Sequence, residues 1–385
     1  MSGPDGGEAV RAIGALRAIA LAACVGLLAG PSLADIKSFN AAVKAGNFKV
    51  AAAEAVATWP TLNKARKDLA IIAREFGFAA MMAQDFKAAR MFAAEAMKET
   101  GAGADADDSR ALSAVLLRAA EFRAAPDDYT RETLMAALRV RESAPGFDGI
   151  TFVAVQALVD HDFGWLHWKE ALESSTAAVK IASAGGPSYR LSLMRFEMVQ
   201  AAALYAASGD KQHVDKLKAL ARRAKDEIDN AASDEAAARF VQVYREIGLW
   251  AEATDLEPSP KVAVAIITPP PPAPGPELRS IRLLKSGPKR DETCKRKLDP
   301  QYPPFPPQFR GSDKFAAMYS YAMDIDDSGR PSNIRVLAGV PNSATAKYVI
   351  DLLKEWSMER ETWADRCSLA QKDYILTLKL LPPPR

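Results

Sequence analysis

Apolar residues recur at helical spacing through the amino-terminal two thirds of the chain. Between His213 and Ile228 they fall three or four positions apart on one stripe, and Ser233 is placed to cap the helix that follows. From Phe315 to Ile325 the pattern changes to strict alternation, which indicates a strand. The sequence therefore predicts a helical region followed by a smaller region that contains strands.

The helical region carries a degenerate repeat in which a turn is followed by an aromatic residue and then by small residues on one helical face. The four segments are Gly46-Asn47-Phe48, Gln84-Asp85-Phe86, Asp127-Asp128-Tyr129 and Leu166-His167-Trp168, with aromatics 38, 43 and 39 residues apart. Small residues let antiparallel helices approach closely, and stacked helix pairs bury a continuous core. The architecture resembles tetratricopeptide repeats, in which Gly77 fits the glycine of a first helix. The resemblance implies an all-α solenoid that either binds a protein partner or acts as a spacer.

The carboxy-terminal region predicts the order strand, strand, helix, strand. Asp326-Asp327-Ser328-Gly329 supplies a turn after the first strand, and alternation at Ile334 and Val336 predicts the returning strand of a hairpin. Ser343 is placed to cap a helix, and alternation from Tyr374 to Leu380 predicts the last strand. This pattern is typical of a small α+β domain of order β-β-α-β.

Local motifs in this order resemble the carboxy-terminal domain of the TonB family over about residues 297–381. The matching motifs are Pro300-Gln301-Tyr302-Pro303, Asp327-Ser328-Gly329-Arg330, Asn333-Ile334-Arg335-Val336 and Trp356. The resemblance implies a periplasmic domain that adds an extended segment of an outer-membrane transporter to a sheet edge. The partner-binding residues that it implies are Gln301, Tyr302, Tyr374, Ile375, Leu376, Thr377 and Leu378.

The amino terminus predicts export. Arg17 precedes a thirteen-residue run without charge, and Pro31-Ser32-Leu33-Ala34 has the small residues of a cleavage site. We expect residues 1–34 to be a signal peptide, with an uncleaved membrane anchor or a lipid on Cys24 as alternatives. We further expect a helical repeat domain at 35–256, a proline-rich linker at 257–276 and the TonB-like domain at 277–385.

Cleavage after Ala34 would leave two cysteines, Cys294 and Cys367, in one small domain. In an oxidising compartment such a pair favours a disulfide, the alternative being two free thiols.

The composition argues against nucleic-acid binding, catalysis and metal binding. The 385 residues include 50 Lys and Arg against 48 Asp and Glu, a net charge of +2, which disfavours a dedicated nucleic-acid binder. The chain has three His and three Cys, and no nucleophile with a base, phosphate loop or metal-ligand spacing stands out. His161 and His167 are too far apart to form a metal pair on a single helical face, and they read as core or turn residues. We therefore expect no enzyme, no cofactor and no metal site.

The sequence-based hypothesis is an exported, non-enzymatic adaptor of the cell envelope. Its TonB-like domain would bind an extended peptide of an outer-membrane or periplasmic protein, presented by the helical scaffold. Two alternatives stay open. One is an energy transducer for outer-membrane transport with an uncleaved anchor, and the other is a solenoid-centred scaffold with a structural carboxy-terminal cap.

Overall fold

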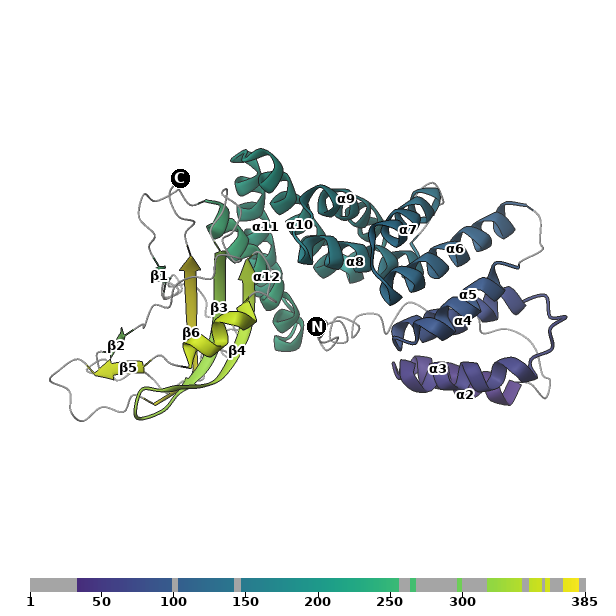
Figure 1. Cartoon of the computed structure of the whole chain (residues 1–385), viewed down its shortest axis with the longest axis horizontal. Helices are drawn as coiled ribbons and strands as arrows, with labels where there is room; N and C mark the ends of the chain where they lie inside the picture. Colours follow the sequence, from purple (N-terminus) through teal and green to yellow (C-terminus); the bar gives the residue numbers. More distant parts are fainter. Residues whose placement is uncertain are drawn as a thin grey trace. The chain divides into compact units, whose positions relative to one another are not determined.

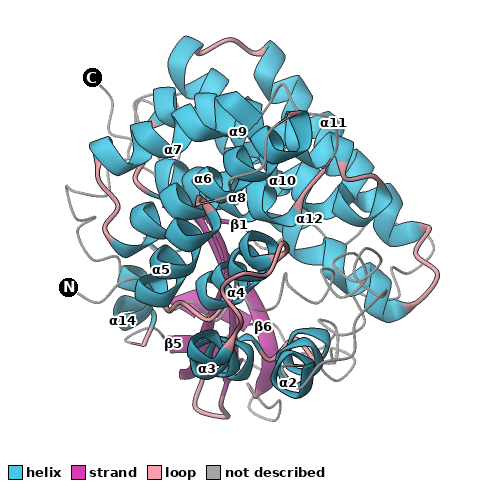
Figure 2. Cartoon of the chain, turned by 90° about the vertical axis from the view of Figure 1, so that its right-hand side faces the viewer, coloured by secondary structure: helices cyan, strands magenta, loops and turns pink. Residues whose placement is uncertain are grey.

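The computed structural model describes residues 33–98, 103–141, 147–255, 264–267, 296–299, 317–340, 346–354, 357–360 and 370–380. A mostly helical region of consecutive packed helices is followed by a small antiparallel sheet (Figures 1 and 2). The chain divides into two compact units: helices α2 to α7 belong to the first, and most of α10, α11, α12 and the strands belong to the second, while α8 and α9 contribute to both.

Eleven consecutive α-helices precede the strands in the described part of the chain. They are α2 (Leu33–Lys44), α3 (Phe48–Thr58), α4 (Leu69–Met82), α5 (Phe86–Ala96), α6 (Ala104–Ala124), α7 (Asp128–Arg141), α8 (Gly149–Gly164), α9 (Trp168–Ala184), α10 (Arg190–Ser208), α11 (Gln212–Asp229) and α12 (Asp234–Thr254). The predicted change from helices to strands is therefore confirmed. The two helices predicted around His213 and Ser233 are α11 and α12, and the Ser233 side chain accepts a hydrogen bond from the Ala236 amide as the expected cap.

Three of the four predicted repeat turns share one backbone geometry. Gly46, Gln84 and Leu166 all have a positive φ, at 70°, 64° and 61°, and each ends a helix. In each turn the amide of the following residue donates to a carbonyl five positions earlier, as in the Asp85 amide to Ala80 oxygen bond of 2.9 Å. This is the Schellman arrangement, which closes a helix and reverses the chain. The fourth turn differs, because α6 runs to Ala124 and α7 begins at Asp128 without a positive φ.

Aromatic packing holds the first helices of the first unit together. Phe76 on α4 lies 4.6 Å from Phe39 on α2 and 5.5 Å from Phe92 on α5 between ring centroids, and Trp59 packs against both Phe76 and Phe92. Gly77 of α4 lets α5 and α6 come close, since a Cβ there would stand 3.3 Å from the Phe92 Cβ and 2.9 Å from Leu116 of α6. The glycine that the repeat pattern singled out is therefore a close-packing position.

The sheet has the strand order β1-β6-β3-β4, and all neighbours are antiparallel. Its strands are β1 (Val264–Ile267), β3 (Ala317–Ile325), β4 (Pro331–Val340) and β6 (Gln371–Leu380). The predicted hairpin is confirmed: Asp326 Oδ1 accepts bonds from the amides of Ser328 and Arg330, and Gly329 has a φ of 81°. Between β4 and β6 lie the short helices η6 (Lys347–Val349) and α14 (Ile350–Leu353). A separate pair joins β2 (Arg296–Asp299) to β5 (Ser357–Arg360).

Both faces of the central strand β3 are buried. One face, with Tyr319 and Tyr321, forms the core with β6 and with Leu353 of α14. The buried Tyr321 hydroxyl donates to the Ala346 oxygen over 2.9 Å, and burial raises the pKa of that phenol. Met318 and Ala322 on the opposite face are also buried, and α12 packs against β4 and β3. The alternating pattern predicted the strand, but the burial of both faces was not expected.

Candidate functional site

The outer edge of β6 is the place where the sequence predicts partner binding. In the structure β6 pairs with β3 along one side, and on the other side β1 pairs with its last four residues, with Ile267 opposite Thr377 and Val264 opposite Leu380. The edge therefore accepts an extended strand in antiparallel register, and within the described residues that strand comes from the same chain. After Ile267 the sequence continues with Thr268 and then four prolines, which have no backbone N–H to donate to a ladder.

Most of the described side chains of β6 are buried. Tyr374, Leu376 and Leu378 point into the core beside β3. Thr377 is buried on the other face, where its hydroxyl donates to Ser320 Oγ over 3.3 Å, and Ile375 is half-buried. Recognition at this edge would consequently use the β6 backbone, with little contribution from these side chains.

Helix α12 lies against β4, at the opposite end of the strand order (Figure 1). The β3–β4 register shifts between Ser320 and Tyr321, so that Leu337 has no partner in β3. Gln242 of α12 donates its side-chain amide to the Leu337 carbonyl over 2.6 Å. This contact covers one backbone carbonyl on β4, the strand at the other edge of the sheet.

A polar cluster fixes the hairpin end of the sheet. Asp324 accepts a bond from the Asn333 side chain at 2.8 Å and from the Asp373 backbone amide at 3.0 Å. These bonds, in that order, lower the pKa of the Asp324 carboxyl, and the charge of Arg335 adds to the effect. Asn333 and Asp373 both have a positive φ, at 49° and 51°. Asp324 thus ties together two strained positions on the strands that flank it.

Two of the predicted binding residues, Gln301 and Tyr302, lie outside the described residues. So do Cys24, Cys294 and Cys367, residues 1–32 of the predicted signal peptide, most of the proline-rich linker, Ser343 and Trp356. The disulfide, the cleavage site and the binding motif before the first strand stay predictions.

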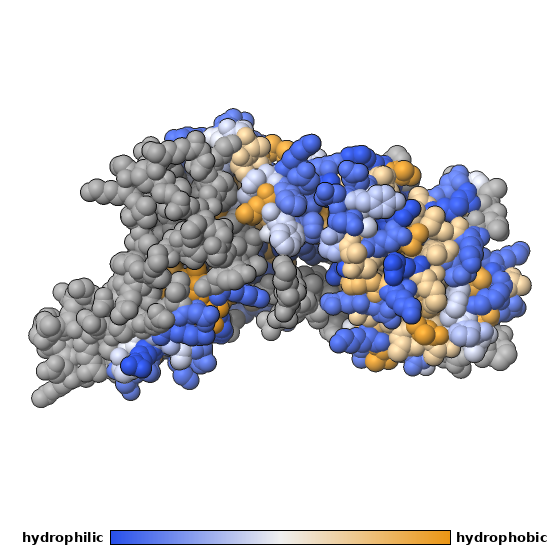
Figure 3. Space-filling model, viewed as in Figure 1, coloured by the Kyte–Doolittle hydropathy of each residue, from blue (hydrophilic) through white to orange (hydrophobic). Residues whose placement is uncertain are grey.

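Among the described residues, several apolar side chains are exposed on the helices. Val50 and Val56 of α3 and Met91 of α5 are each more than two-fifths exposed. On the face drawn in Figure 3, apolar residues over α2 to α5 are interspersed with polar ones. This distribution does not single out a docking face on the first unit.

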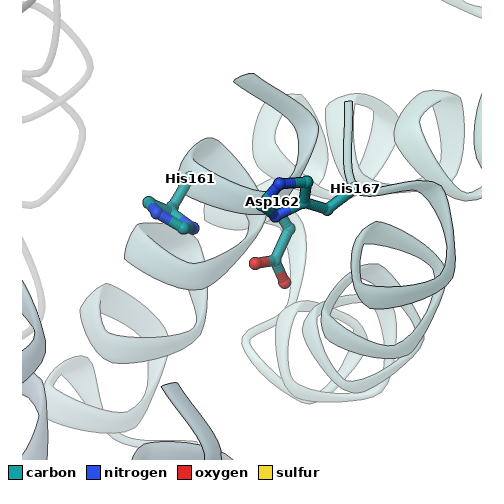
Figure 4. A group of neighbouring side chains, drawn as sticks. All are labelled: His161, Asp162 and His167. Carbon is teal, nitrogen blue, oxygen red and sulfur yellow. The ribbon is translucent and has the colours of Figure 1, made fainter. Parts of the chain in front are cut away.

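Two histidines and an aspartate converge where α8 ends (Figure 4). One potential ligand atom from each of His161, Asp162 and His167 lies within 4.8 Å of the other two. Their sequence spacing separates them on a continuous helix, but α8 stops at Gly164 and the turn brings His167 back toward Asp162. The spacing rule applied to the sequence missed this group because it assumes an unbroken helix.

None of the described helices is long and apolar enough to span a membrane. Comparison with known proteins finds no matching protein family, no similar curated protein and no similar solved structure.

Proposed function

We propose that this protein is an exported, non-enzymatic adaptor of the cell envelope that binds an extended peptide segment of an outer-membrane or periplasmic protein by strand addition at β6. The observation that carries the proposal is the β1–β6 pairing, since an edge that accepts Val264–Ile267 has the geometry to accept another extended strand. The packed helices would present this sheet as a tetratricopeptide-like scaffold. The sequence resemblance to TonB domains supports the class of partner.

The partner strand would replace β1 on the β6 edge. β1 pairs along four residues, whereas β6 has ten, so a longer partner strand could form more backbone hydrogen bonds. Since the side chains of Tyr374, Leu376 and Leu378 are in the core, affinity would come mainly from the backbone ladder. A short resident strand that ends before a proline run is suited to such an exchange.

Photo-crosslinking in intact cells tests the proposal. One probe replaces Ile375 on β6, and the other replaces the exposed Gln212 at the start of α11. We expect an outer-membrane or periplasmic protein to be trapped at Ile375 and not at Gln212. Adducts only at Gln212, or only with a second copy of this chain at Ile375, would refute strand addition to a partner.

Proline substitutions in β1 sharpen the test. Backbone N–H groups alternate in direction along a strand, so only one of Ala265→Pro and Ile266→Pro removes a donor that faces β6. We expect one variant to increase the crosslinking yield at Ile375 and the other to change it much less. Each variant therefore serves as the other's matched control.

A second candidate is a structural cap, in which β1 permanently closes the edge and the helices alone bind partners. The same β1–β6 pairing and the packing of α12 on β4 favour it. It predicts that neither proline variant raises crosslinking at Ile375, whatever is trapped at Gln212.

A further inference from the structure

We propose that His161, Asp162 and His167 bind one Zn²⁺ ion at the carboxy-terminal end of α8. The three residues lie within seven consecutive positions, so their arrangement is set by the local backbone of one helix end and the turn after it (Figure 4). The proposal is independent of strand binding at β6.

The turn creates the proximity. The His167 amide donates to the Asp162 carbonyl over 2.9 Å and the Leu166 amide to Phe163 over 3.2 Å, while Leu166 has a φ of 61°. These bonds end α8 and reverse the chain direction, which places His167 next to Asp162. The His167 carbonyl in turn accepts the Ala171 amide of α9 over 2.7 Å. Hydrogen bonds thus hold the backbone at both ends of the turn.

The donor set suits zinc. Two imidazoles and one carboxylate are common Zn²⁺ ligands, and three protein ligands leave a fourth position for water. Sulfur ligands are absent from the group, which argues against a soft cation such as Cu(I). Two of the three histidines in the whole chain take part.

The burial of Asp162 and the exposure of His167 both suit an ion site. Asp162 is 0% exposed, so its attraction for a cation is weakly screened by water. His167 is exposed and gives an ion a route from solvent. The His161 ring packs edge-on against Phe122, with centroids 5.1 Å apart, which restricts its orientation.

The distances require a modest adjustment. Tetrahedral zinc with bonds of about 2.0–2.1 Å holds its ligand atoms about 3.4 Å apart, whereas the three atoms here lie within 4.8 Å. Because His167 is exposed, rotation of its ring is one way to shorten these distances. An ion held by all three side chains would link the end of α8 to the turn before α9.

Calorimetric titration of the full chain with Zn²⁺ tests the site, after alkylation of the cysteines so that thiolates do not compete. We expect one ion per chain. The exposed His167→Gln variant should lose at least about tenfold in affinity, the lower range seen when even outer-shell partners of metal ligands are removed. His161→Gln should show the same loss. His213→Gln removes the remaining histidine, which is 6% exposed on α11, and should leave the affinity unchanged.

Two further readouts separate a built site from loose surface binding. Co²⁺ in place of Zn²⁺ should give the intense visible absorption of a four-coordinate ion, and this band should be lost in His167→Gln. Zinc should also raise the melting temperature of the wild-type chain but not of His167→Gln, with circular dichroism confirming that the variant is folded. Failure to bind one equivalent, or equal binding by wild type and both ligand variants, would overturn the proposal.

Discussion

The side-chain amide of Gln242 donates a 2.6 Å hydrogen bond to the backbone carbonyl of Leu337, residues that are 95 positions apart. Leu337 is the extra residue where the β3–β4 register shifts, so it has no paired residue in β3. The carbonyl of this bulge residue thus accepts a hydrogen bond from α12, the last helix of the helical region. The contact joins α12 to the sheet within one compact unit.

Replacing Gln242 by Met should weaken this junction. The variant keeps a side chain of similar length but loses the donor, and we expect a loss of about 0.5–1.5 kcal/mol in the free energy of unfolding. Amide hydrogen exchange should rise around the β4 bulge. Glu246→Gln is the control, since it keeps the Leu337 bond while it changes the other acceptor of the Gln242 amide and removes the 3.9 Å ion pair with Arg195. Equal exchange in both variants would contradict the assigned role.

Gly77→Ala should destabilise the chain by about 1–3 kcal/mol, the range for overpacked cores. Its Cβ would stand 2.9 Å from Leu116 and 3.3 Å from the Phe92 Cβ. Gly248→Ala in α12 is the matched control: nothing lies within 4 Å of a Cβ there, and alanine should stabilise the helix by about 0.5–1 kcal/mol. Urea denaturation of both variants measures the contrast. Destabilisation of similar size in both would mean that close packing at Gly77 is not the cause.

Gln84→Gly should stabilise the turn between α4 and α5. Gln84 is exposed with a φ of 64°, and the equivalent turn between α2 and α3 already has Gly46 at 70°. Relief of the left-handed backbone exceeds the entropy cost of glycine, so we expect a gain of about 0.5–1 kcal/mol. Thermal unfolding should show the gain for glycine and none for Gln84→Ala, which keeps the Cβ.

Acid should weaken the hairpin end of the sheet through Asp324. Its folded pKa is lowered by hydrogen bonds from Asn333 and the Asp373 amide. A lowered folded pKa gives stability that is present above the unfolded value of about 3.9 and is lost as the pH falls through the folded value. Asp324→Asn should therefore be less stable than wild type at pH 7, with a smaller difference at pH 3. A difference that stays constant between these pH values would exclude this carboxylate as the source.

Much of the secondary structure could be predicted because it depends on local patterns. Alternation around Tyr319 and Tyr321 placed β3, turn residues placed the hairpin at Asp326, and the aromatic after each repeat turn marked a helix start at Phe48, Phe86 and Trp168. Gly77 could be singled out because close helix packing leaves a recognisable small residue.

The candidate sites depended on contacts that local patterns do not encode. The pattern from Tyr374 to Leu378 identified β6 and suggested partner contacts, yet alternation cannot tell a side chain that faces the core from one that faces a ligand. Nor could it reveal that Val264–Ile267 pairs with β6, because strand pairing across more than a hundred residues is set by the whole fold.

The sequence by itself determined the helices, the hairpin and the last strand, since hydrophobic period and turn chemistry act over a few residues. Only the tertiary structure decided that α12 covers β4 and that β1 lies on the β6 edge. These relationships depend on where each element ends and what it then packs against. Where an element ends and what it packs against are both fixed by burial and backbone hydrogen bonding once the whole chain has folded.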